Sequence, residues 1–587
     1  MPRFRSLAAT STLALALTAL VASPAGAITS AESEVTGEQQ YVVLFAEGAT
    51  ATAARAAVEA AGGTIVAENA EVGVATVVTT ESDFAAEAAA QPVIEGTALN
   101  RVFADVPEAQ KGAGAADKFD AAKADLRSVG AGAAAGAPVT RPSKGKPLAE
   151  PLAALQWDMQ AIDATVDGSY RHDKTKGVLV GILDTGVDGS HPDIAPNFDA
   201  ELSRNFTVDI EVDANGDPID GACADEPDQS CEDPADVDEN GHGTHVASTI
   251  GSPINGIGIA GVAPDVKLVN LRAGQDSGYF FLQASVDALT YAGDVGIDVV
   301  NMSYYVDPWL FNCTSHPADS AEDQAEQQTI ITAMQRALDY ARDHGVTLVA
   351  AAGNGASDYT KVLSDSSSPD FASEPGEVAY TRDLLDPASC VSMPSEGEGV
   401  ISVSSTGPSE RKSYYSNYGN GYVDVAAPGG DVYDTVAGTR DYAAGILAAY
   451  PAALAAEEGA IDENGDVVVP WAVKSCNATG ETCAYYQYLQ GTSMASPHAA
   501  GVAALIVGQY GKSDALRGGK TLPPATTESI LLSTAVDTAC PDPAAFEYVR
   551  HLPSGATVTA THVCEGEPTK NGFFGDGIVN ALAAIGR

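Results

Sequence analysis

Basic residues are scarce in this sequence of 587 residues. Lysine and arginine together number 31, against 79 aspartates and glutamates, and the formal net charge at pH 7 is −48. Such an excess of negative charge repels nucleic acid and anionic membrane surfaces, so we expect neither as a partner. Most of these carboxylates should simply be solvated, while some remain available to bind calcium.

Long apolar runs are also missing. The apolar stretch Leu13 to Val21 is too short to span a bilayer, which argues against a membrane anchor, and no later run is long enough either. It follows Arg3 and Arg5 and precedes Ala25-Gly26-Ala27, a small-x-small cleavage pattern. We therefore predict that residues 1–27 are a secretory signal peptide and that the mature protein is secreted, soluble and extracellular.

The sequence has no CxxC pair and no cluster of cysteine with histidine, so nothing in it suggests a zinc site. Its eight cysteines, an even number in an exported chain, predict disulfides. About a hundred connectivities are open to eight cysteines. Pairing between neighbours in the sequence is the preference: Cys223 with Cys231, Cys313 with Cys390, Cys476 with Cys483, and Cys540 with Cys564.

Residues 41–103 have a pattern of their own. Apolar runs and alanine-rich stretches follow the order strand, helix, strand, strand, helix, strand, at 41–45, 51–61, 64–67, 72–79, 82–90 and 93–103. Residues 104–150 then become rich in Ala, Gly, Lys and Pro without an apolar period. We predict that they are a mobile linker open to proteolytic processing.

Residues 151–587 alternate short apolar runs with helical patterns, which indicates an α/β domain with a parallel sheet and helices on both faces. The buried-strand candidates are 178–183, 266–271, 299–303, 347–352 and 400–404. One helix candidate, 328–344, places Ile330, Met334 and Leu338 along one stripe and has Gly345 just past its end.

Three polar segments of this domain carry side chains that suit nucleophilic catalysis. Asp184 follows the first strand candidate, at the sheet edge where open α/β folds place their sites. His242 and Ser493 each open a helix candidate, and a serine there gains from nearby backbone N–H groups as negative charge develops. A serine hydroxyl needs a base to remove its proton and an acid to orient that base. We expect loops at one sheet edge to bring the three together.

The order aspartate, histidine, serine is the order found in subtilisin. The segments are Leu183-Asp184-Thr185-Gly186, Gly241-His242-Gly243-Thr244-His245 and Gly491-Thr492-Ser493-Met494-Ala495-Ser496-Pro497-His498. Residues 155–585 therefore resemble the subtilisin-like serine peptidases.

The resemblance implies a role for each residue of these segments that matters to catalysis. Ser493 would be the nucleophile, His242 the general base and acid, and Asp184 the residue that orients His242. Asn354, in Ala350-Ala351-Ala352-Gly353-Asn354, would hold the oxyanion. The resemblance also implies that residues 41–103 are a small α+β, ferredoxin-like propeptide domain of the inhibitor type.

The sequence departs from the family pattern beside the expected substrate cleft. The resemblance implies that Ser303, Tyr304, Tyr305 and Gly353 contact the substrate, but the family usually has Leu-Gly where this chain has Tyr304-Tyr305. A tyrosine at position 305 would narrow the pocket for the P1 side chain and favour small residues there. The alternative is that Tyr305 turns away into an insertion. Insertions at about 205–238, 306–390 and 431–485 hold six of the eight cysteines, so we expect them to be cross-linked.

A structural calcium site is a further implication of the resemblance. Asp193, in His191-Pro192-Asp193, would give a carboxylate and Asn255, in the loop 253–259, an amide oxygen, with loop carbonyls completing the shell. The family's N-terminal glutamine ligand has no convincing counterpart in this sequence.

These observations predict a secreted, self-processing serine endopeptidase that acts on proteins or peptides. We expect a monomer, no catalytic cofactor, and the chain's own propeptide as an intramolecular inhibitor. One alternative is a narrow-specificity maturation protease, which Tyr304, Tyr305 and the insertions favour. Another is a catalytically silent protein-binding scaffold, against which the presence of all four catalytic residues argues.

Overall fold

The computed structural model describes residues 39–100, 150–211, 219–225, 229–366, 368, 381–514 and 518–586. The predicted signal peptide and nearly all of the predicted linker lie outside these residues. In the described part of the chain no helix is both long and apolar enough to cross a membrane.

Residues 39–99 form an antiparallel sheet with two helices. The strands are β1 (Gln39–Phe45), β2 (Thr64–Asn69), β3 (Val74–Thr79) and β4 (Ile94–Leu99), in the order β2-β3-β1-β4, and the helices are α1 (Ala51–Ala60) and α2 (Phe84–Ala89). Thr50 caps α1 by accepting the N–H of Ala53, and Ala54, Ala57 and Val58 are the buried stripe of that helix. The predicted order of elements is confirmed, and the topology is ferredoxin-like.

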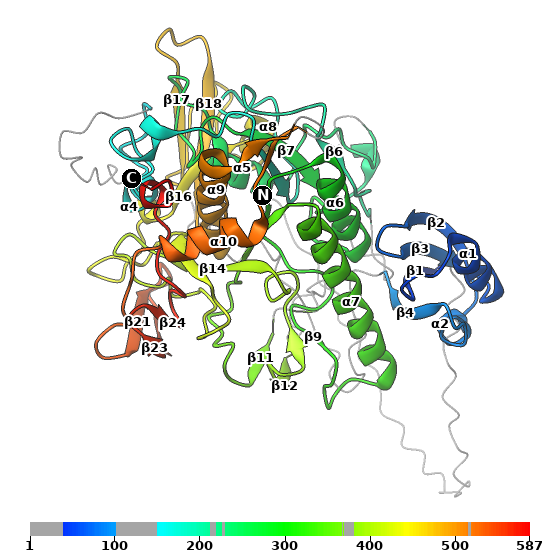
Figure 1. Cartoon of the computed structure of the whole chain (residues 1–587). Helices are drawn as coiled ribbons and strands as arrows, with labels where there is room; N and C mark the ends of the chain where they lie inside the picture. Colours follow the sequence, from blue (N-terminus) through cyan, green and yellow to red (C-terminus); the bar gives the residue numbers. More distant parts are fainter. Residues whose placement is uncertain are drawn as a thin grey trace, which may run out of the picture. The chain divides into compact units, whose positions relative to one another are not determined.

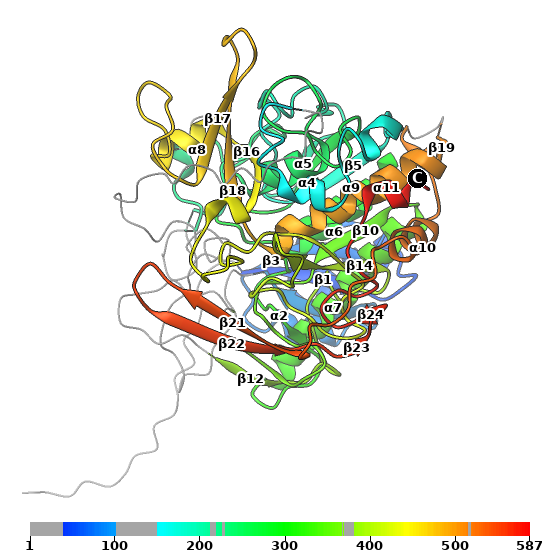
Figure 2. The same cartoon turned by 90° about the vertical axis from the view of Figure 1, so that its left-hand side faces the viewer.

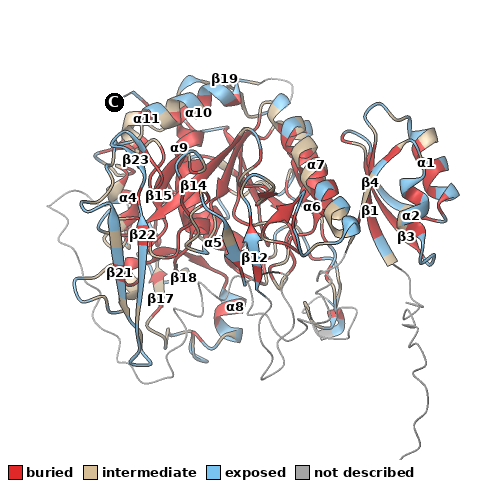
Figure 3. Cartoon of the chain, turned by 90° about the horizontal axis from the view of Figure 1, so that it is seen from below, coloured by how far each residue is buried: buried red, intermediate tan, exposed pale blue. Residues whose placement is uncertain are grey.

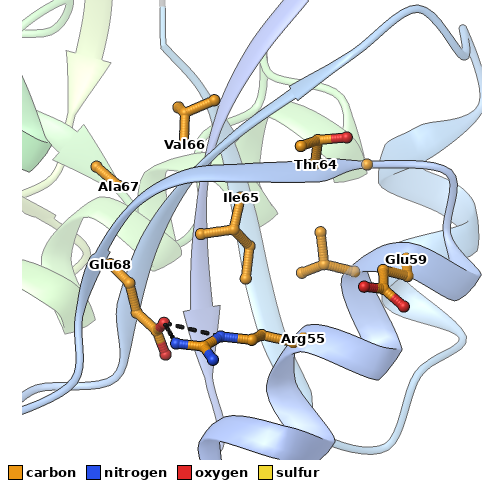
Figure 4. A pocket seen from close by; sticks show the side chains of 9 residues that line it. Arg55, Glu59, Thr64, Ile65, Val66, Ala67 and Glu68 are labelled. Atoms are coloured by element: carbon orange, nitrogen blue, oxygen red, sulfur yellow. Dashed lines mark hydrogen bonds and ion pairs between the residues drawn. The ribbon is translucent and has the colours of Figure 1, made fainter.

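A hollow of about 430 Å³ lies between α1 and β2 of this region (Figure 4). An ion pair between Arg55 and Glu68, with a nitrogen–oxygen distance of 2.7 Å, crosses one side of it. None of the residues predicted to act in catalysis lines the hollow.

The central sheet of the larger domain has seven strands in the order β15-β14-β10-β8-β5-β7-β6, and its neighbouring strands run parallel. They are β5 (Leu179–Leu183), β6 (Arg204–Asn205), β7 (Lys267–Arg272), β8 (Val299–Met302), β10 (Thr347–Ala351), β14 (Val400–Thr406) and β15 (Val425–Pro428). The five predicted strands are all present; the short β6 and β15 were missed.

Helices cover both faces of this sheet, as predicted (Figures 1 and 3). Val180 and Ile182 of β5 face a core shared with α5 (His242–Gly251) and α9 (Thr492–Tyr510). Leu179 and Leu183 face the opposite core, shared with α6 (Leu282–Val295) and α7 (Ala321–Asp343). Alternate side chains of a strand point to opposite faces, so an all-apolar strand such as β5 serves both cores.

Helix α7 begins earlier than the predicted start at residue 328. Ser320 accepts the N–H of Asp323 while the Asp323 side chain accepts the N–H of Ser320, which is a capping box. The predicted end is confirmed, because Gly345 follows the helix with φ +100°, a conformation that glycine adopts without strain.

The insertions contribute small sheets and short helices. The second forms the pairs β9–β13 and β11–β12. The third forms the sheet β16-β18-β17 with α8, which Figure 2 shows above the hairpin β21–β22. The remaining bounds are α4 (Trp157–Ala161), η2 (Ser169–His172), η3 (Cys223–Asp225), β9 (Asn312–Cys313), β11 (Leu363–Asp365), β12 (Arg382–Leu385), β13 (Cys390–Val391), η4 (Tyr442–Ala444), β16 (Ile446–Tyr450), α8 (Ala452–Glu457), β17 (Ala472–Cys476), β18 (Cys483–Leu489), β19 (Lys512–Ser513), β20 (Lys520–Thr521), α10 (Pro524–Ser533), β21 (Ala545–His551), β22 (Thr557–Val563), β23 (Gly566–Glu567), β24 (Lys570–Asn571) and α11 (Ala581–Ala584).

Four disulfides join the cysteines that were preferred as partners. They are Cys223–Cys231, Cys313–Cys390, Cys476–Cys483 and Cys540–Cys564. The first three lie in the three insertions, so each insertion is cross-linked.

Candidate active site

Asp184 and His242 form a buried, hydrogen-bonded pair. Asp184 is the first residue after β5, and His242 is the first residue of α5. The His242 Nδ1 lies 2.6 Å from the Asp184 Oδ1, and both side chains are buried. A β-carbon on Gly243 would come within 2.1 Å of the Gly186 carbonyl oxygen, so only glycine lets α5 approach the strand end this closely. The pair holds the imidazole with Nδ1–H on the carboxylate, which leaves Nε2 to accept a proton.

Ser493 lies in the first turn of α9, at the same edge of the sheet. Its Oγ donates to the carbonyl oxygen of Ser303, the first residue after β8, at 3.2 Å. The side chain of Ser303 in turn donates to the carbonyl of Ser493 at 3.2 Å. Because β8 is the direct neighbour of β5 in the sheet, these contacts bring the serine to the strand end that Asp184 occupies.

Asn354 approaches the serine from the other side. It follows β10, which lies next to β8 on the side away from β5. Its Oδ1 accepts both the N–H and the hydroxyl of Thr492 at 2.9 Å. The N–H of Gly353 donates to the same hydroxyl at 3.0 Å. With Oδ1 bound to the helix, Nδ2 is left as the donor of an exposed side chain beside Gly491. Nδ2 and the backbone N–H groups of the first turn of α9 can together hold an oxyanion.

The model of the subtilase family matches residues 175–577 of this chain. The chain belongs to the subtilase family. The resemblance to the subtilisin-like peptidases, predicted for residues 155–585, is thereby confirmed over residues 175–577.

Known relatives include characterised serine proteases. The chain is 29% identical to the thermophilic serine proteinase of Bacillus sp. (strain AK1) over 344 residues, which is 58% of this chain and 55% of the relative. It is 26% identical to subtilisin DY of Bacillus licheniformis over 337 residues, 57% of this chain and 79% of that protein. The chain thus spans about half the length of the Bacillus sp. proteinase.

Among solved structures, the fold is similar to that of the epidermin leader peptide processing serine protease of Staphylococcus aureus. The TM-score is 0.56 at 20% identity, and the likeness covers 94% of this chain and 98% of that one. Fervidolysin of Fervidobacterium pennivorans gives a TM-score of 0.52 at 20% identity over 94% of this chain and 62% of its own.

The two tyrosines of this subtilase that were expected to contact substrate point in different directions. Tyr304 is buried and stacks on Phe280, with ring centroids 4.1 Å apart, inside the core on the α6 side. The Tyr305 hydroxyl is buried, and its pKa is raised by that burial and by the charges of Asp365 and Tyr279. Asp365 belongs to β11 of the second insertion. This placement favours the alternative in which Tyr305 turns toward the insertion.

Asp238 was missed by the sequence analysis, although it helps to place His242. Its carboxylate accepts the N–H of Gly241 at 2.8 Å and the N–H of Thr244 at 2.9 Å, and so it caps the start of α5. An aspartate shortly before the start of a predicted helix is a typical helix cap, so the position of Asp238 before the histidine motif could have indicated this role.

A second missed pair supports the nucleophile helix. His498 is fully buried, and its Nδ1 donates to the carbonyl of Met494 at 2.8 Å while its Nε2 lies 3.1 Å from the Asp158 carboxylate. Asp158 belongs to α4, so the pair joins α4 to the first turns of α9. His498 ends the serine motif, but nothing in the sequence indicated Asp158 as its partner.

Asp193 and Asn255, the predicted calcium ligands, lie together. The Asn255 Nδ2 donates to the Asp193 Oδ1 at 3.1 Å, and the Asn255 Oδ1 accepts the N–H of Ile257 at 3.0 Å. A third residue lies at the same loop: the Glu150 carboxylate accepts a hydrogen bond from the N–H of Gly256 at 2.9 Å.

Only part of this group fits a cation: the two carboxylates do, whereas Asn255 turns its nitrogen toward Asp193 and not the amide oxygen that was expected as a ligand. Asp193 and Glu150 are both buried. Burial, together with the charge of Glu150, raises the pKa of Asp193 to about 7, and burial also raises the pKa of Glu150. A calcium ion bound by oxygen ligands would lower the cost of burying these two carboxylates. Glu150 was missed because it follows directly on the predicted linker.

A different acidic cluster of this subtilase already contains its counter-charge. Asp209, Asp233 and Asp276 surround the fully buried guanidinium of Arg272, which lies 3.2 Å from Asp209 and 3.0 Å from Asp276 and also bonds Asp233. The arginine therefore supplies the positive charge that a metal ion would otherwise bring, and the cluster ties the first insertion to the end of β7.

Proposed function

We propose that this subtilase is a secreted serine endopeptidase that hydrolyses peptide bonds through an acyl-enzyme intermediate. The observation that carries the proposal is the buried Asp184–His242 hydrogen bond of 2.6 Å at the sheet edge that also holds Ser493 and Asn354. No cofactor is required for this chemistry.

Each of the four residues then has one task. The Ser493 Oγ attacks the scissile carbonyl carbon as its proton passes to the His242 Nε2, and Asp184 stabilises the imidazolium that forms. The carbonyl oxygen becomes an oxyanion that accepts hydrogen bonds from the Asn354 Nδ2 and from the N-terminus of α9. The imidazolium gives its proton to the leaving amine, and a water molecule later releases the acyl group from Ser493 by the same route.

We propose further that residues 41–103 are an inhibitory propeptide and that the protein is made as a zymogen. Support comes from contacts between this region and the outer helices of the peptidase domain. The Asn69 Nδ2 donates to Asp287 and Thr290 of α6 at 2.7 Å, and Arg336 of α7 donates to the Phe45 carbonyl at 2.8 Å and pairs with Glu95 at 2.6 Å. Adding the separate segment 38–103 to the mature enzyme should therefore slow it.

The Ser493→Ala variant of the full chain tests both proposals. We expect it to lose peptide hydrolysis and labelling by a fluorophosphonate probe, and to keep residues 28 to about 150, because the nucleophile that would remove them is gone. Mass spectrometry of the secreted protein reads the retained segment directly. Normal maturation of the purified variant, with no other protease present, would contradict self-processing, while probe labelling elsewhere would contradict the role of Ser493.

A narrow-specificity maturation protease remains the second candidate. The solved Staphylococcus aureus relative is described as processing the leader peptide of epidermin, and its fold is similar over 94% of this chain. Profiling of cleavage sites separates the two: a few defined sequences indicate a maturation protease, and cleavage of many proteins indicates a degradative one. The catalytically silent scaffold predicts no probe labelling of the wild-type protein.

We also propose that the mature protein is a monomer that holds structural calcium at Asp193, Asn255 and Glu150. Glu150, Leu152 and Gln156 all bond the loop 253–260, so the processing site lies before Glu150 if this site is to form in the mature enzyme.

A further inference from the structure

The backbone on either side of Ser493 determines where the P1 side chain of a substrate must lie. One segment, Ser303–Val306, leaves β8, and its first carbonyl accepts the Ser493 hydroxyl at 3.2 Å. The other, Ala352–Asn354, leaves β10 and bonds Thr492 through Asn354 at 2.9 Å. Since β8 and β10 are neighbours, the two segments flank Ser493, and the P1 side chain of a substrate whose carbonyl oxygen reached Asn354 would lie between them.

A third segment, Ser392–Glu396, is attached to both of the others. On the first side, the N–H of Val306 donates to the carbonyl of Met393 at 2.9 Å. On the second side, the hydroxyl of Tyr359 donates to the carbonyl of Ala352 at 2.8 Å, and Tyr359 also lies against Ser392 and Ser395. The segment Ser392–Glu396 therefore links the two others, and we call it the closing segment.

The surroundings of this closing segment are polar and acidic. The Glu396 carboxylate folds back over its own turn and accepts the N–H of Ser392 at 2.7 Å. It lies close enough to the Tyr359 hydroxyl for its charge to raise the pKa of that tyrosine. Asn417 is buried and donates to the Tyr359 hydroxyl at 2.9 Å. An apolar P1 side chain could not form hydrogen bonds with these groups. It would also displace the water that solvates them, which costs free energy.

Glu396 also has no basic side chain as a partner in the part of the chain that the structure describes. Arg342, which donates to the nearby Gly399 carbonyl at 2.7 Å, is already paired with Glu528 at 2.8 Å. Burial raises the pKa of Glu396 to about 7, which reflects the cost of a charged carboxylate that lacks a counter-ion. A cationic ligand would relieve that cost.

We propose that Glu396 is a specificity-determining residue that binds a lysine or arginine side chain at P1. The proposal rests on the proposed function, because it assumes that Ser493 attacks peptide bonds. It replaces the small P1 residue expected from Tyr305, since the hydroxyl of that tyrosine is buried within reach of the charge of Asp365 in the second insertion. The substrates would be proteins or peptides cut after a basic residue.

The experiment compares peptides that differ only at P1. Arginine, its uncharged isostere citrulline, and alanine are placed at P1, and kcat/KM is measured for the wild type, Glu396→Gln and Glu398→Gln. Glu398 is an exposed neighbour of Glu396 and serves as the matched control. Active-site titration with a fluorophosphonate corrects every rate for the fraction of folded enzyme.

We expect the wild type and Glu398→Gln to prefer arginine over citrulline by about 100-fold, the size of a charge-assisted contact of some 3 kcal/mol. Glu396→Gln should lower that ratio to below about 5. An arginine-to-citrulline ratio within threefold of 1 in the wild type, or a ratio unaffected by Glu396→Gln, overturns the proposal. Preference for alanine restores the Tyr305 hypothesis. Absence of both cleavage and labelling would instead contradict the proposed function.

Discussion

Hydrogen bonds from Thr492 fix the orientation of the Asn354 side-chain amide. Its Oδ1 is held by two donors of Thr492, so its Nδ2 is already directed outward before substrate arrives. We expect Asn354→Ala to lower kcat by about 10²–10³-fold with little change in KM, as removal of this donor does in subtilisin itself. Steady-state kinetics on any cleaved peptide provides the measurement. The control is Thr492→Val, which loosens the amide without removing it and should cost less. A loss below tenfold for Asn354→Ala would contradict its role.

At the scale of elements, the proposed calcium site joins three parts of the chain. Asp193 accepts hydrogen bonds from Asn255 of the loop 253–259 at 3.1 Å and from Tyr486 of β18 at 3.0 Å. Glu150 bonds the same loop at the N–H of Gly256. Binding an ion here should therefore stabilise contacts that are distant in sequence.

We expect calcium to raise the melting temperature of this protein. A free calcium concentration 100 times the Kd should add about 2.7 kcal/mol of apparent stability, and a chelator should remove it. Glu150→Gln should weaken calcium binding, while Glu457→Gln, an exposed acid on α8, should not. Calorimetry of the full-length Ser493→Ala chain, which cannot digest itself, measures the effect. An unchanged melting temperature in chelator would show that the site holds no calcium.

At the scale of the whole molecule, acidity should make stability depend on pH in an unusual direction. Burial raises the pKa of Asp298 and that of Glu396 to about 7. These groups keep their protons in the folded state but lose them near pH 4 when unfolded. Their contribution to stability is therefore complete below about pH 4 and is lost as the pH rises through about 7. Repulsion within a chain of net charge −48 acts in the same direction.

We expect the free energy of unfolding to fall between pH 5 and pH 8, by up to about 1.4 kcal/mol per pH unit for each retained proton. In the wild type the N–H of Leu179 donates to the Asp298 carboxylate at 2.8 Å. Asp298→Asn keeps an oxygen that can accept this hydrogen bond but has no titrating proton. The free energy of unfolding of this variant should therefore depend less steeply on pH. The exposed control Asp343→Asn should keep the wild-type slope. Thermal unfolding of the Ser493→Ala chain in saturating calcium is the measurement. Equal slopes for the Asp298→Asn and unmodified chains would contradict the assignment.

The sequence by itself determined the features that depend on neighbouring residues. Buried parallel strands are short apolar runs, so β5, β7, β8, β10 and β14 could be found from residues 178 to 404. The motifs around Asp184, His242, Ser493 and Asn354 are local as well, because each combines a reactive side chain with the glycines and helix start that position it. Cysteines close in sequence can pair across a short turn, as Cys223–Cys231 and Cys476–Cys483 do, and the preferred pairs Cys313–Cys390 and Cys540–Cys564, which close longer loops, are present as well.

Only the tertiary structure decided what isolated residues do. In the sequence, Glu150 and Glu396 cannot be distinguished from the other aspartates and glutamates among the 79. The roles proposed for them depend on their burial and on contacts that only the fold creates. The directions of Tyr304 and Tyr305 depend on Phe280 and Asp365, which the chain brings to them from separate elements. The physical reason is the same in each case: periodicity and motifs record local backbone geometry, whereas desolvation and charge at a side chain are set by whatever the fold packs around it.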